Sequence, residues 1–277
     1  MVVKKIFKNN LKLLVNKLEI DIVRKRKINY KKNFDLSQLD LSSINIIHNI
    51  KLRELITTAG KKLGSKEDPY YRALYLSLPI QNKQKFIKSF IREIKLIVNK
   101  PRNASDAIGI KNTKLARYPE WSLVLPWDNI SIEDNYSSYL KKFISKRNDI
   151  KNMYLKISKK QRDYLIYHDL SWKSHAEQFF SLYRSISQKG FQETNLVPVN
   201  LFKFNNSYRF SLSDDGNHRV RTVFVLGIKS IPLKISKVID FDSIDNWTNV
   251  KNKLYSKKEA KKIFIDYFNY SGKGAYV

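Results

Sequence analysis

Residues 214–221 read Asp214-Asp215-Gly216-Asn217-His218-Arg219-Val220-Arg221 and lie where a strand pattern gives way to a helical one. Glycine lets the backbone approach a ligand closely, and the first amides of the following helix have no partners within it. These amides and the positive end of the helix dipole favour an anion, above all phosphate. Arg219 and Arg221 add donors that suit phosphate oxygens, and His218 can exchange a proton near neutral pH. The stretch therefore predicts a phosphate site, and the alternative is a polar turn with a capping aspartate and solvent-facing arginines.

The segments on either side predict an α+β fold. We expect a helix from about Ser171 to Gln188, closed by Gly190, and then strands at 196–202 and 208–212 joined by a turn at 205–206. After the quoted stretch come a helix at 220–226, ended by Gly227, and a strand at 231–238. This order of helix, hairpin, helix and strand is typical of the α+β class.

The quoted stretch also resembles a known motif, the glycine-x-Arg-Arg-x-Arg box of ParB-like domains, with His218 in place of the first arginine. Residues 226–233 (Leu-Gly-Ile-Lys-Ser-Ile-Pro-Leu) are similar to the ending of that superfamily, and residues 185–199 resemble its helix end, glycine turn and first hairpin strand. The resemblance covers residues 169–239 and implies a small ParB/sulfiredoxin-like domain of mixed sheet and helices. We accordingly expect a basic helical N-terminal region at 1–118, this domain at 119–245, and a C-terminal helix and tail at 246–277.

The resemblance implies nucleotide chemistry, because members of that superfamily bind nucleoside triphosphates. The expected cofactors are ATP or CTP together with Mg²⁺. The phosphates would be held by the box, that is by Gly216, Asn217, His218, Arg219 and Arg221. Asp214 and Asp215 are the expected metal ligands, and Asp215, His218 and Glu193 are the expected catalytic groups.

Two features narrow the class within the superfamily. Sulfiredoxins carry a cysteine where this chain has Asn217, and the absence of any cysteine excludes sulfinic acid repair through a thiol. Partition proteins place DNA-binding and dimerisation regions after the nucleotide box, and the 37 residues that follow Asp240 here are too few for both. We therefore expect a nucleotide-dependent kinase, a phosphotransferase for a hydroxyl-bearing small molecule, with a sugar or polysaccharide precursor suggested by family analogy.

The charge balance favours an alternative function. The sequence has 53 Lys and Arg against 25 Asp and Glu, a formal charge of +28, which attracts polyanions. The chain would then be a non-catalytic DNA- or RNA-binding protein of ParB-like type. Abundant Lys, Asn and Ile also match the coding bias of an AT-rich genome, and such bias is the alternative explanation for part of the charge. Residues 3–27 form a basic amphipathic pattern that would either dock on the protein or lie on an anionic membrane.

The remaining patterns concern location and the N-terminal half. No apolar run approaches the roughly 18 residues of a membrane span, and no secretory signal pattern is present, so we expect a cytoplasmic protein, with peripheral membrane contact through residues 3–27 as the alternative. Helices are expected from Ser42 or Ser43 to Gly60, from Asp68-Pro69 onward, and at 86–97. We also expect a short strand at 122–125 and a last helix at 257–267.

Overall fold

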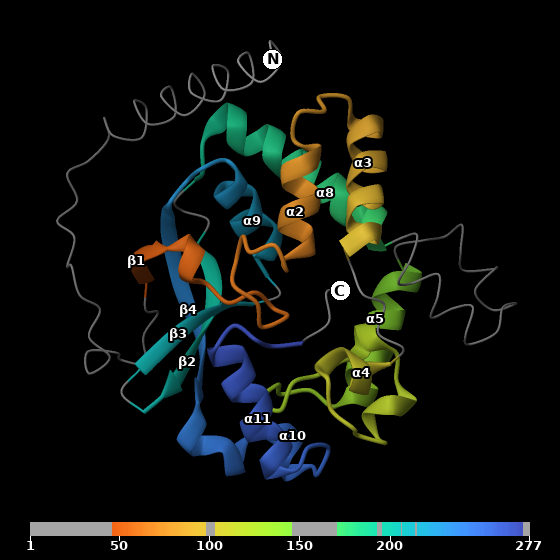
Figure 1. The fold of residues 1–277 in the computed structure, drawn as a ribbon, viewed down its shortest axis with the longest axis vertical. Coiled ribbons are helices and arrows are strands. Elements are labelled where there is room, and N and C mark those ends of the chain that lie inside the picture. The colour runs from red at the N-terminus through yellow and green to blue at the C-terminus, as the bar shows by residue number, and fades with distance from the viewer. Residues whose placement is uncertain are drawn as a thin grey trace, which may run out of the picture.

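The computed structural model describes residues 46–97, 103–145, 171–192, 196–205, 207–213 and 215–273. Within these ranges the chain has the expected α+β architecture, a four-stranded mixed sheet combined with helices (Figure 1). The predicted amphipathic segment 3–27, Asp214 and Glu193 lie outside the described residues. Among the residues that are described, no helix is both long and apolar enough to cross a membrane.

The elements have the following bounds. The strands are β1 (Ile46–Lys51), β2 (Val197–Phe204), β3 (Ser207–Leu212) and β4 (Ser230–Asp240). The α-helices are α2 (Pro69–Ser77), α3 (Lys83–Ile97), α4 (Ala104–Ile108), α5 (Ile132–Ser145), α8 (Ser171–Lys189), α9 (Asn217–Val225), α10 (Thr248–Lys251) and α11 (Lys257–Phe268). Short 3-10 helices are η2 (Leu52–Glu54), η3 (Leu115–Arg117), η4 (Glu120–Ser122) and η6 (Phe241–Asn246).

The sheet has the strand order β1-β4-β2-β3. Strands β2 and β3 form an antiparallel hairpin whose turn contains Asn205 at a positive φ of 50°. Strand β4 runs parallel to β2, and the required crossover is supplied by β3 and α9. Strand β1 adds antiparallel to the free edge of β4. This topology places the start of α9 directly after the hairpin.

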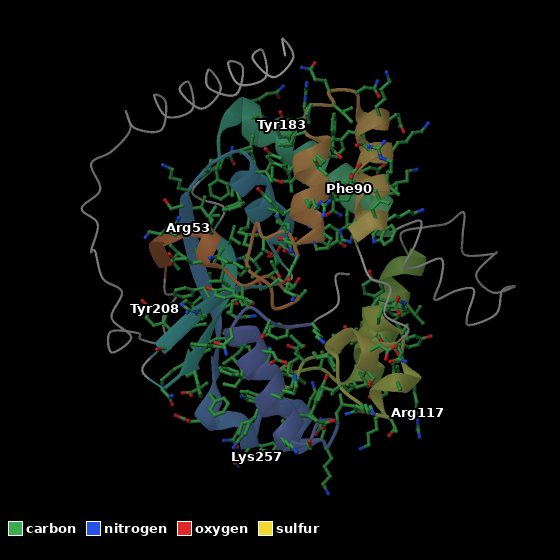
Figure 2. All side chains as sticks on the ribbon, in the orientation of Figure 1. Arg53, Phe90, Arg117, Tyr183, Tyr208 and Lys257 are labelled. Carbon is green, nitrogen blue, oxygen red and sulfur yellow. The ribbon has the colours of Figure 1, made fainter. Side chains whose placement is uncertain are left out.

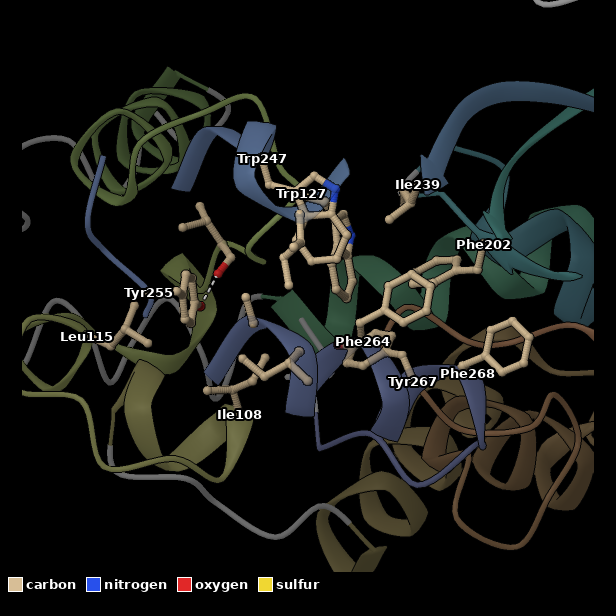
Figure 3. Packing of buried hydrophobic residues seen from close by; sticks show 14 of the residues in the cluster. Ile108, Leu115, Trp127, Phe202, Ile239, Trp247, Tyr255, Phe264, Tyr267 and Phe268 are labelled. Atoms are coloured by element: carbon tan, nitrogen blue, oxygen red, sulfur yellow. Dashed lines mark hydrogen bonds between the residues drawn. The ribbon is translucent and has the colours of Figure 1, made fainter. Parts of the chain in front are cut away.

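The alternation of side chains along β2 directs the two faces of the sheet toward two separate cores. Val197, Val199 and Leu201 face α9 and belong to a cluster with its Val220 and Val223. On the opposite face, residues from β2, α11 and the loop before α5 form an aromatic core (Figure 3), with edge-to-face contacts among Trp127, Phe202, Trp247 and Phe264. The buried valines of α9 therefore hold this helix against the sheet.

Helices α2, α3 and α8 form a third cluster, which packs beside α9. The stripe predicted for residues 86–97 is confirmed, because Phe86, Phe90 and Ile94 of α3 are fully buried. The ring of Phe90 lies 5.4 Å from that of Phe179 on α8. The predicted start of α2 is also confirmed, since the side chain of Asp68 accepts a hydrogen bond from the amide of Tyr71.

Two sequence-based expectations are wrong. The helix expected up to Gly60 is replaced by strand β1 and the 3-10 helix η2, because the edge of β4 offers unpaired backbone groups that a strand can satisfy. The strand expected at 122–125 is absent from this described region. Ser122 is the last residue of η4, and the amides of Ser122 and Leu123 donate to the carbonyls of Pro119 and Glu120. The amide of Leu125 donates to the side chain of Asp128. The local turn bonds satisfy this backbone without a neighbouring strand.

Candidate functional site

Gly216 initiates α9 in a conformation that only glycine adopts without strain. Its φ is +88°, and an added Cβ would lie 2.6 Å from Cγ1 of Val197 on β2. The first helical bond runs from the amide of Val220 to the Gly216 carbonyl at 3.0 Å, so the three amides before Val220 have no acceptor inside the helix. Gly216 has no side chain that could cap them. The start of α9 therefore presents N–H donors that no carbonyl of the helix accepts, together with the positive end of the helix dipole.

The guanidinium of Arg219 lies over this helix start. Its Nη2 is 3.5 Å from the position of a Gly216 Cβ and 3.9 Å from Oδ1 of Asp215. The Arg219 side chain is 25% exposed and that of Asp215 is 85% exposed, so solvent screens their attraction. The cation stands beside the first amides of α9, and its carboxylate neighbour Asp215 is exposed to solvent. This is an arrangement that an anion can enter.

Arg221 occupies a different environment, although the sequence grouped it with Arg219. Its side chain is 1% exposed, and its Nε lies 3.0 Å from each carboxylate oxygen of Asp68, which is itself fully buried. The guanidinium sits 5.5 Å from the centre of the Tyr70 ring. Nη2 has no hydrogen-bond partner among the described residues. Arg221 thus ties α9 to the start of α2, and its direct contact with phosphate stays a prediction.

His218 pairs with a second histidine, His175 of α8. Nδ1 of His175 lies 2.6 Å from Nε2 of His218, and the planes of the two rings differ by 22° with their centres 4.8 Å apart. Burial and the nearby Arg221 guanidinium lower the pKa of His175 to about 4. Burial, followed by His175 and Arg221, lowers the pKa of His218 to about 3. Both rings are partly shielded from solvent and neutral at pH 7.

The other predicted site residues divide into two groups. Asn217 opens α9, and its Oδ1 is buried without a hydrogen-bond partner in the described ranges. Asp214 and Glu193 lie outside those ranges, so their roles stay predictions. No group of three or more His, Cys, Asp or Glu side chains suited to a metal ion occurs in the part of the chain that the structure describes. Asp215 supplies one exposed carboxylate of the kind that Mg²⁺ binds.

The structure adds two residues, Asp68 and His175, to those of the predicted box. Asp68 was expected only as a helix cap, yet it also holds Arg221. Its position in the sequence offers a signal that could have identified it. Asp68 is a carboxylate directly before an apolar helix, and an arginine buried beside such a helix needs a counter-charge. His175 stands on a predicted helix, but its meeting with His218 is fixed by the packing of α8 on α9.

The fold and the site together define an α+β protein in which a glycine opens a helix, and the start of this helix carries amides without helical acceptors, an arginine and a neutral histidine pair. Comparison with protein families, curated proteins and solved structures gives no match for the chain.

Proposed function

We propose that this chain is a nucleoside-triphosphate-binding protein of ParB/sulfiredoxin-like type, and that it transfers a phosphoryl group to a hydroxyl-bearing small molecule. One observation carries the proposal: the uncapped amides at the start of α9 lie beside Gly216 and under the guanidinium of Arg219. Backbone amides at a helix start with an adjacent arginine form a phosphate site. The order α8, β2, β3, α9 and β4 agrees with the segments that carry the resemblance over residues 169–239.

The residues would divide the work of phosphoryl transfer among them. The amides of Asn217 and His218 and the Arg219 guanidinium would bind phosphate oxygens and stabilise the charge that develops during transfer. The hard carboxylate oxygens of Asp215 would hold Mg²⁺, and the ion would supply neutralisation of phosphate charge. Asp215 would also orient the acceptor hydroxyl and take its proton as that oxygen forms its bond to the γ-phosphorus, while the bond from this phosphorus to the bridging oxygen breaks and the nucleoside diphosphate leaves. The acceptor class, with sugars or polysaccharide precursors suggested by analogy, stays part of the proposal.

Thermal denaturation with a panel of nucleoside triphosphates and Mg²⁺ tests this function. A ligand at about 100 times its dissociation constant stabilises the folded state by about 2.7 kcal/mol, which corresponds to a rise in Tm on the order of 5 °C for a chain of this size. We expect such a shift with ATP or CTP for the wild type and its loss in Arg219→Ala.

The matched control is Arg117→Ala, because Arg117 is an exposed arginine in η3 on a remote part of the chain (Figure 2). This variant should keep the full shift. If no triphosphate raises Tm, or if both variants lose the shift equally, the site at α9 is not the nucleotide site.

The second candidate function is non-catalytic binding of DNA or RNA, and the formal charge of +28 favours it. The same panel separates the two candidates. Binding to nucleic acid that falls steeply with salt, with no triphosphate bound at low micromolar concentration, would support the second candidate.

A further inference from the structure

The bond between His175 and His218 determines which atom of His218 can meet a ligand. It joins Nδ1 of His175 to Nε2 of His218 at 2.6 Å. A neutral imidazole has one N–H donor and one acceptor lone pair, so the bond forms only when one of these two nitrogens is protonated and the other is not. The tautomers of the two rings are therefore coupled, and Nδ1 is the one ring nitrogen of His218 left for a ligand.

The surroundings keep both rings neutral. Burial, and after it the Arg221 guanidinium, lowers the pKa of each histidine, and the ion pair with Asp68 fixes that guanidinium in place. Tyr70 of α2 meets the His175 ring edge-on at 5.2 Å, and Phe179 of α8 lies 4.6 Å from the His218 ring. These contacts hold the rings in one orientation, because rotation of either ring would break the hydrogen bond and the stacking.

We propose that His175 is a positioning residue whose Nδ1–H donates to Nε2 of His218 and so keeps the remaining proton of His218 on Nδ1, as a neutral donor for a phosphate oxygen. This inference rests on the proposed function, since it assumes that the ligand at the start of α9 is an anion. His218 is the second residue of α9 and lies in its first turn, where the amides have no acceptor within the helix. With the opposite tautomers, His218 would point a lone pair at the anion and repel it.

The second nitrogen of His175 agrees with this assignment. Nε2 of His175 has no hydrogen-bond partner among the described residues, and the ring is partly shielded from solvent. In the proposed tautomer this nitrogen carries a lone pair, whereas the opposite tautomer would leave an unpaired N–H there. An unpaired N–H is the costlier of the two in a shielded position.

Long-range ¹⁵N NMR of the full chain, labelled at its four histidines, reads the tautomers directly. We expect the Nδ1–H tautomer of His218 in the wild type at pH 7, without ligand. His175→Phe keeps an aromatic ring but removes both nitrogens, so His218 should become a mixture of tautomers. His175→Asn should restore the wild-type tautomer, because its amide N–H can take the place of Nδ1–H. Gln178→Ala, which changes an exposed residue on α8, should leave the spectrum unchanged.

Titration with ATP and with CTP, each with Mg²⁺, adds the binding measurement. We expect His175→Phe to weaken binding roughly two- to fivefold, because only the fraction of His218 that carries its proton on Nδ1 is ready to bind, and His175→Asn to recover most of it. A wild-type protein with the Nε2–H tautomer, or a His218 spectrum or affinity unchanged by His175→Phe, overturns the proposal. If circular dichroism shows that His175→Phe does not fold, the tautomer of the wild type and the affinity of His175→Asn test the proposal instead.

The two proposals fail in different ways. If the wild type binds no triphosphate, the proposed function is wrong, and the ligand-free spectra still decide whether His175 sets the tautomer of His218. If the wild type binds a triphosphate and His218 carries its proton on Nε2, the positioning role is wrong and the nucleotide site stands.

Discussion

The buried pair of Asp68 and Arg221 makes the sharpest prediction at the scale of single residues. Asp68→Asn keeps a capping side chain for α2 but leaves the guanidinium without its counter-charge. We expect a loss of about 3–5 kcal/mol in the free energy of unfolding, measured by urea denaturation. Asp245→Asn is the control, since it breaks an exposed pair with Lys257 and should cost about 1 kcal/mol or less. Equal small losses would contradict the burial of Arg221.

The histidine pair predicts how stability depends on pH. The pKa values of about 4 and about 3 in the folded protein lie below the usual value of 6.5. At pH values between the folded and the unfolded pKa, the unfolded chain binds more protons at these histidines than the folded protein does. The free energy of unfolding therefore falls as pH drops below about 6.5, and the pair has no effect on it above that pH. Each histidine contributes up to about 1.4 kcal/mol per pH unit. Urea denaturation at pH 7, 6 and 5 should show a shallower fall in His175→Phe. The same slope in variant and wild type would exclude a neutral buried pair.

The sequence predicted part of this site, and helix geometry explains the part that it misplaced. Gly216, His218 and Arg219 meet at the start of α9 as expected. Residues two apart on a helix point about 200° away from each other, so Arg219 and Arg221 cannot serve the same ligand from one face. Their partners, one at the helix start and one in α2, depend on tertiary packing, which no local pattern encodes.

At the scale of elements, the glycines on either side of helix α9 allow a matched comparison of two substitutions. Gly216 and Gly227 have φ of +88° and +82°, but a Cβ on Gly216 would contact Val197 at 2.6 Å, whereas a Cβ on Gly227 meets nothing within 4 Å. We expect Gly227→Ala to cost roughly 1–2 kcal/mol for its left-handed backbone. Gly216→Ala should cost about 1–3 kcal/mol more, because β2 must shift. Urea denaturation measures both losses, and equal losses would show that α9 does not press on β2 at this glycine.

The elements that the sequence predicted well are those whose pattern reflects burial. The two valines and the leucine of β2 alternate because one face meets α9, and the stripe of α3 repeats because one side meets α8. Strand β1 was missed, since its partner β4 lies far along the chain and the pairing uses backbone groups. The segment at 122–125 was misread because apolar residues between two prolines also suit a turn whose side chains are buried.

At the scale of the whole molecule, the basic charge and the proposed nucleotide site are separable. Lys85, Lys88 and Arg92 share the exposed side of α3, opposite the buried Phe86 and Phe90, and cations there attract nucleic acid without reading its sequence. Since Arg219 lies on a different helix, the two kinds of binding should respond to different substitutions.

We therefore expect the wild type to bind a random DNA duplex weakly at 50 mM salt and to lose roughly 10³-fold or more in affinity by 200 mM, if about six phosphates are contacted. Replacing Lys85, Lys88 and Arg92 by Gln should flatten this salt dependence, measured by fluorescence anisotropy, and leave triphosphate binding unchanged. Arg219→Ala should abolish triphosphate binding and leave the salt dependence of DNA binding unchanged. Its guanidinium serves one compact anion site and contributes little to the electrostatic field of the whole surface. DNA affinity that persists at 200 mM salt and disappears in Arg219→Ala would instead place nucleic acid at the start of α9, and the kinase proposal would give way to the binding protein.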